Sequence, residues 1–99
     1  ATASIRGGAK FAAFASAKAA QRSLAQSMAR HLWPAGIHVS LLIIDGVIDL
    51  ARTREMMPDK PDSFFLKPDA IADAVFNVTR QDPSAWSFEF EVRPSTEKW

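Results

Sequence analysis

The chain has 99 residues, of which 47% are hydrophobic, and its 12 basic and 11 acidic residues leave a net charge of +1. This length supports one domain with one modest core. The absence of cysteine excludes a disulfide framework and thiolate metal ligation, and four scattered glycines exclude a phosphate-binding loop. No run of about 18 apolar residues predicts a membrane span. We expect a cytoplasmic protein, because no signal peptide is recognised.

The predicted elements start with a loop over residues 1–11 and a long helix over residues 12–33. Helical periodicity gathers apolar residues on one arc of that helix, and Pro34 ends it. A strand over residues 37–44 follows, and its run Leu41–Ile44 is apolar on both faces, which is typical of a central parallel strand. The residues of the helical arc are Phe14, Ala17, Leu24, Ala25, Met28 and Leu32.

Residues 45–67 predict an irregular loop with one short helical turn, because they contain two prolines and several charges. A second helix is predicted over residues 68–80. A last strand is predicted over residues 86–93, where large apolar residues alternate with polar ones. Two strands joined by a helix are expected to be parallel, which gives a single α/β domain over residues 1–99. Since two strands make a small sheet, we expect further strands, absent from this sequence or supplied by another chain.

The charge is unevenly distributed, because residues 1–44 contain five basic and no acidic residues. Such a start is compatible with a mitochondrial transit peptide or a nucleic-acid-binding arm. We favour one face of a solvated helix, because the segment continues into a core strand and its bases are not interleaved with aromatic residues. Nucleic acid is therefore not an expected partner.

Three features in this order resemble the short-chain dehydrogenase/reductase family. Phe14-Ala-Ser-Ala-Lys18 lies where that family has Tyr-x-x-x-Lys on a long helix, and the strand after Gly36 matches its next buried strand. The segment 45–50 matches the family loop Pro-Gly-x-[Val/Ile]-x-Thr. The resemblance covers the C-terminal half of the family only, and it implies a partial Rossmann-like fold without the nucleotide-binding half.

The resemblance also implies a broken catalytic set. In the family the Tyr hydroxyl transfers a proton, a Ser thirteen residues earlier holds the substrate oxygen, and the Lys lowers the phenol pKa and binds the nicotinamide ribose. Here the Tyr position is Phe14 and the Ser position is Ala1, so only Lys18 remains. Lys18 is either this relic or a surface lysine, and Phe14 is either a disabled catalyst or a packing residue. The cofactor-binding residues implied are Lys18, Gly46, Val47 and Ile48.

Two functions follow from this sequence. The first is a truncated domain, not catalytic alone, that acts through self-association or partner binding, with a homo-oligomer formed through the 12–33 helix and the 86–93 strand. The alternative is the C-terminal part of an NAD(P)-dependent oxidoreductase that acts on a carbonyl or alcohol. No cofactor is expected for the isolated chain, and NAD or NADP is expected if the nucleotide-binding half is supplied. No metal site is expected, because His31 and His38 lack a carboxylate partner at a ligating spacing.

Overall fold

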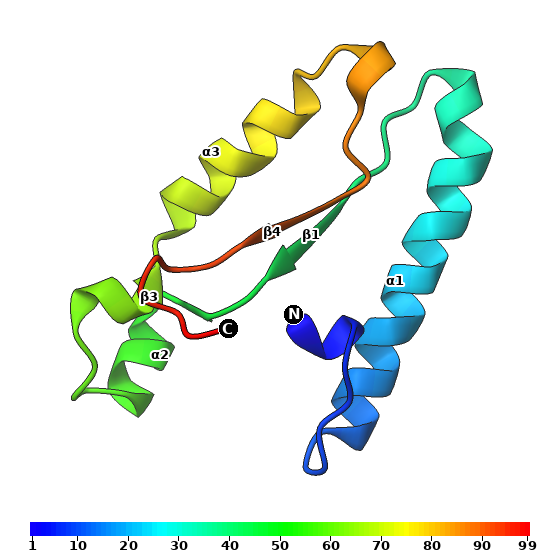
Figure 1. Cartoon of the computed structure of the whole chain (residues 1–99). Helices are drawn as coiled ribbons and strands as arrows, with labels where there is room; N and C mark the ends of the chain where they lie inside the picture. Colours follow the sequence, from blue (N-terminus) through cyan, green and yellow to red (C-terminus); the bar gives the residue numbers. More distant parts are fainter.

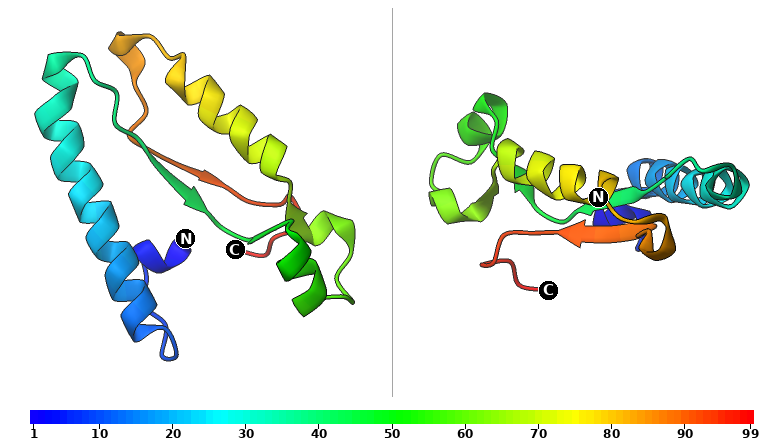
Figure 2. Two further views of the ribbon diagram at one scale, coloured as in Figure 1. Left: turned by 180° about the vertical axis from the view of Figure 1, so that it is seen from behind. Right: turned by 90° about the horizontal axis from the view of Figure 1, so that it is seen from above.

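Two long helices lie on opposite sides of a two-stranded parallel sheet in the computed structural model, which describes residues 1–99 (Figures 1 and 2). The helices are α1 (Ala12–Leu32) and α3 (Pro68–Thr79), and the strands are β1 (Leu41–Ile44) and β4 (Glu89–Val92). The strands pair in register from Leu41 opposite Glu89 to Ile44 opposite Val92. This arrangement confirms the predicted α/β fold with two parallel strands and two main helices.

The segment 45–67 is more ordered than the irregular loop that the sequence predicts. It contains the helix α2 (Ala51–Met56) and two strands, β2 (Val47–Ile48) and β3 (Phe65–Leu66), that form a second parallel pair. Strands of two residues are too short to show a periodicity of two, so the sequence pattern missed them. The remaining elements are single 3₁₀ turns at Thr2–Ser4, Trp33–Ala35, Asp62–Phe64 and Pro83–Ala85.

Both main strands are shorter than the ranges predicted for them. Residues 37–40 and 86–88 and Arg93 lie outside the strands β1 and β4. Side-chain hydrogen bonds join the segments 37–40 and 86–88. The Ser40 hydroxyl donates to the backbone oxygen of Ser87 at 2.7 Å, and the His38 imidazole lies 2.9 Å from the same oxygen.

No helix of the structure is both long enough and apolar enough to cross a membrane.

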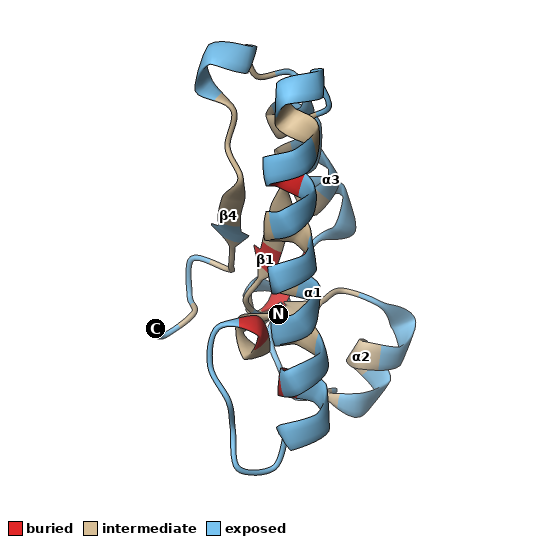
Figure 3. Cartoon of the chain, turned by 90° about the vertical axis from the view of Figure 1, so that its right-hand side faces the viewer, coloured by how far each residue is buried: buried red, intermediate tan, exposed pale blue.

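The helix α1 presents small residues, and not its apolar arc, to the interior. Ala15 and Ala29 are buried, whereas Phe14, Leu24 and Met28 on the apolar arc are 49%, 61% and 43% exposed. On the face that carries the two alanines, Arg22 makes a bidentate ion pair with Glu89 of β4, at 2.7 and 3.1 Å. This pair joins that face of α1 to the sheet, and most of the outward side of α1 is exposed (Figure 3).

The chain exposes far more surface than a self-contained domain of its size. Its accessible surface is 7129 Å², against about 5,600 Å² for a folded monomer of this mass. Its radius of gyration is 15.4 Å, against about 13 Å for a compact domain of 100 residues. The excess of about 1,500 Å² is roughly twice the area that each partner contributes to a standard protein interface. Ile43, on β1, is the one large side chain with less than 2% exposure.

One edge of β1 has no neighbouring strand, since β1 pairs with β4 alone. The amides of Leu41 and Asp45 donate to the backbone oxygens of Phe88 and Val92, on the β4 side. Successive residues of a strand direct their backbone groups to opposite edges. The backbone groups of Leu42 and Ile44 therefore face the free edge.

Candidate functional site

One cavity of about 580 Å³ brings together residues that are far apart in the sequence. The first turn and the loop after it supply one wall, the start of α1 supplies a second, and the end of β1 with β2 supplies the third. A cavity of this volume is within the range of small-molecule sites. Its lining residues are Ala1, Thr2, Ala3, Arg6, Gly7, Gly8, Phe11, Phe14, Ile44, Gly46 and Val47.

Five residues that the family resemblance singles out lie in or beside this cavity. Ala1, Phe14, Gly46 and Val47 line it. Lys18 does not, but its ammonium lies 5.7 Å from the centroid of the Phe14 ring and donates a 3.2 Å hydrogen bond to the Gln21 side chain. Phe14 and Lys18 are one helical turn apart, so this proximity follows from their spacing in α1.

The cavity offers apolar surface and one cationic side chain but no proton donor at position 14. Neither Ala1 nor Phe14 carries a hydroxyl, and Phe14 is 49% exposed toward solvent. The charged residue of the lining is Arg6, which is exposed. An arrangement of this kind can bind a ligand, but position 14 cannot move a proton.

Gly46 is held at the turn between β1 and β2 by a backbone conformation and by close neighbours. Its φ is +152°, which residues with a side chain rarely adopt. A Cβ atom there would lie 3.0 Å from Leu66 Cδ1 and 3.0 Å from Pro94 Cδ. The glycine therefore lets β3 and the segment after β4 approach the cavity loop. Ile48 follows in β2, paired with Leu66.

Asp45, at the family's proline position, forms an ion pair that the sequence did not reveal. Its carboxylate lies 3.2 Å from Nε of Arg93, and both side chains are largely buried, at 13% and 17% exposure. Arg93 also pairs with Glu91, and its guanidinium lies 3.9 Å from the Trp99 ring. The pair joins the end of β1 to the end of β4 and so fixes the loop that forms one wall of the cavity.

Arg54 fixes the segment 45–67 from within. Its guanidinium donates to both oxygens of Asp49, at 2.6 and 2.8 Å, and to Asp62 at 2.6 Å. It also lies 4.2 Å from the centroid of the Phe65 ring. The hydrogen bonds from Arg54 hold the pKa of Asp49 below its usual range. Loop residues more than ten positions apart are thus tied to one side chain.

This ion pair predicts an acid-sensitive contribution to stability. Because the pKa of Asp49 is lower in the folded chain, the contribution is complete above about pH 4 and is lost as the pH falls through the folded value. Below about pH 4, we expect the urea midpoint of unfolding to decrease less steeply with falling pH in Arg54→Gln than in the parent chain. Arg52→Gln, on the exposed neighbouring position of α2, is the control and keeps the parental profile. Equal profiles for the two variants would contradict the role of Arg54.

Glu89 and the two histidines lie outside the lining of this cavity. Glu89 is paired with Arg22, and the structure brings together no group of three or more His, Asp or Glu side chains that could hold a metal ion. His31 is exposed, whereas His38 stacks on Trp86 with 4.5 Å between ring centroids. The histidines therefore serve different elements and do not form a site together.

Comparison with known proteins gives one informative match. No protein-family model matches the chain, and no curated protein matches it either. The chain is similar to the crystal structure of a short-chain dehydrogenase from Rhodopseudomonas palustris, with 47% sequence identity and a TM-score of 0.69. The match covers 94% of this chain and 34% of that chain. The chain therefore spans about a third of the length of the dehydrogenase to which it is similar, as a partial Rossmann-like fold.

Proposed function

We propose that this chain is the substrate-side part of a short-chain dehydrogenase-like domain and that it acts by association, without transferring protons itself. The observation that carries the proposal is the unpaired edge of β1 within a chain that exposes about 1,500 Å² more than expected for its mass. A further parallel strand at this edge would pair the backbone groups of Leu42 and Ile44. The 47% identity to one third of a dehydrogenase supports a sheet with more strands than two.

The exposed arc of α1 supports a second contact in the same assembly, between two copies of the chain. Leu24 and Met28 lie one turn apart on this arc and are both exposed. Small residues between them, such as Ala25, allow another helix to approach closely. We propose a homo-oligomer through α1, and through β4 as a further contact.

Amide hydrogen exchange tests the association at β1. In the chain alone we expect the amides of Leu42 and Ile44, which face the free edge, to exchange at least about tenfold faster than those of Leu41 and Asp45. The alternating residues of one strand are matched controls for each other. In the associated protein we expect all four to be protected. Equal and slow exchange in a monomer shown by sedimentation would contradict the proposal.

A second candidate is the C-terminal part of an NAD(P)-dependent oxidoreductase acting on a carbonyl or alcohol. It is supported by the cavity that Gly46 and Val47 line, with the Lys18 ammonium close behind Phe14. The placement of these residues fits the nicotinamide end of a dinucleotide. Lys18 offers a cation, and Val47–Ile48 lie in a strand whose second edge has free backbone groups. Lys18, Gly46, Val47 and Ile48 would hold this end, and the bound group would supply the hydride. Enhancement of NADPH fluorescence by the protein, reduced in Lys18→Met, would favour this candidate.

A further inference from the structure

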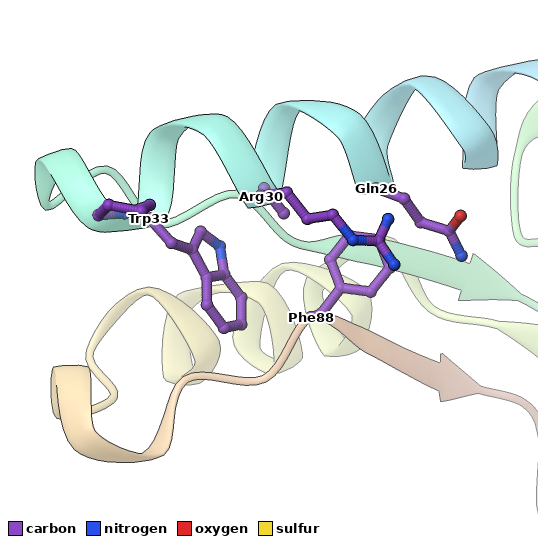
Figure 4. A pocket seen from close by; sticks show the side chains of 6 residues that line it. Gln26, Arg30, Trp33 and Phe88 are labelled. Carbon is purple, nitrogen blue, oxygen red and sulfur yellow. The ribbon is translucent and has the colours of Figure 1, made fainter.

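A second cavity, of about 430 Å³, lies at the other end of α1 from the candidate site. Trp33, Pro34 and Phe88 give it apolar walls, and the polar side chains of Gln26 and Arg30 stand over it (Figure 4). None of these residues belongs to the catalytic or cofactor-binding set discussed above. The cavity is therefore independent of the candidate site.

The aromatic wall is held rigidly before any ligand arrives. The indole of Trp33 donates to the backbone oxygen of Val39 at 3.0 Å and packs edge-on against His38 and Trp86. The Trp86 indole in turn donates to the backbone oxygen of Gln81 at 3.2 Å. A ring that is fixed in this way loses little conformational entropy when a flat ligand packs on it.

The polar side of the cavity carries an unpaired positive charge. Arg30 makes no ion pair or side-chain hydrogen bond in the structure. Glu89, which follows the lining residue Phe88 in the sequence, is already bound by Arg22. Figure 4 shows the Arg30 guanidinium and the Gln26 amide on the side of α1 that faces the Phe88 ring. A guanidinium has a planar fork of donors that matches a carboxylate.

We propose that this cavity binds a small carboxylate attached to a flat apolar ring. The ring packs against Trp33 and Phe88, and the carboxylate accepts hydrogen bonds from Arg30, with the Gln26 amide as a further donor. The volume accommodates a ligand of one or two fused rings. The chemistry recognised is an aryl carboxylate, and its neutral carboxamide lacks the charge that Arg30 requires.

The test compares the binding of 2-naphthoate and 2-naphthamide to the 99-residue chain. The chain is used in the oligomeric state in which it is purified. We expect saturable binding of 2-naphthoate that quenches tryptophan fluorescence and shifts the Trp33 indole N–H resonance. We expect at least about tenfold weaker binding of 2-naphthamide, and a similar loss of naphthoate affinity in Arg30→Gln, because a charge-assisted hydrogen bond is removed in each case. Lys10→Gln, which removes an exposed charge outside the cavity, should bind like the parent.

Three results would overturn the proposal. They are equal binding of the two probes, unchanged naphthoate affinity in Arg30→Gln, and no saturable binding by a folded protein. The last result counts against the proposal even where a second copy of the chain covers the cavity. Arg30 is exposed, so its replacement should leave the thermal midpoint unchanged and the comparison valid. Hydrogen exchange at β1 and naphthoate binding at Arg30 report on different residues, so each proposal can fail while the other stands.

Discussion

Ile43→Ala is expected to lower the free energy of unfolding by about 2–5 kcal/mol, the range for truncating a buried isoleucine. Ile43 is 1% exposed, and it lies on the strand that joins α1, the sheet and the cavity loop. Few other large side chains are buried in this chain, so Ile43 supplies a large share of its core. The loss is measured by urea unfolding at neutral pH.

Leu24→Ala is the matched control for this prediction. Leu24 is also a large aliphatic residue, but it is 61% exposed, so its removal should cost the isolated chain no more than about 0.5 kcal/mol. At concentrations where the chain self-associates, Leu24→Ala should weaken association instead. Comparable losses from the two variants in a monomer would show that β1 is not the centre of the core.

The double replacement Phe14→Tyr and Ala1→Ser is expected to create carbonyl reduction when the nucleotide-binding half is supplied together with this chain. It restores the two hydroxyl groups that the family resemblance assigns to proton transfer, and the Lys18 ammonium near position 14 would favour the ionised phenol. General acid–base catalysis contributes about 10²–10⁴-fold. We expect a gain of this order over the parent in NADPH oxidation with a small ketone.

The control adds Lys18→Met to the double replacement. Without the ammonium the phenol should keep its ordinary pKa near 10. The rate at neutral pH should then fall, and the alkaline limb of the pH–rate profile should shift to higher pH. Turnover by the parent equal to that of the restored variant would contradict the assignment of position 14. Phe14 is half exposed, so the tyrosine hydroxyl costs the fold little.

The main elements could be predicted from the sequence because each one is long or strongly patterned. Alanine content and Pro34 define α1, and the run Leu41–Ile44 defines a strand covered on two faces. The pairing of β2 with β3 could not be predicted, since its four residues carry no period and their pairing is set by tertiary contacts. The face of α1 that meets the sheet could not be predicted either. It carries the ion pair between Arg22 and Glu89, which are 67 positions apart in the sequence.

The sequence predicts which residues lie in the candidate site better than it predicts the ion pairs that hold the site in place. The spacing of Phe14 and Lys18 on a helix brings these residues together, and the family resemblance adds Ala1 and Gly46 to them. The pairing of Asp45 with Arg93 gave no sequence signal, because opposite charges 48 positions apart meet only when β1 and β4 are neighbours. The same holds for the cavity at Trp33, which needs Phe88 from a distant strand.

The open edge of β1 has a consequence for how the protein is made. An apolar strand whose amides and carbonyls lack partners is a template for any other extended chain, including another copy of itself. For this chain expressed alone, aggregation at the open edge is therefore expected to become faster as the concentration rises. We therefore expect the soluble yield of this chain expressed alone to rise when a strand that covers the edge is expressed with it.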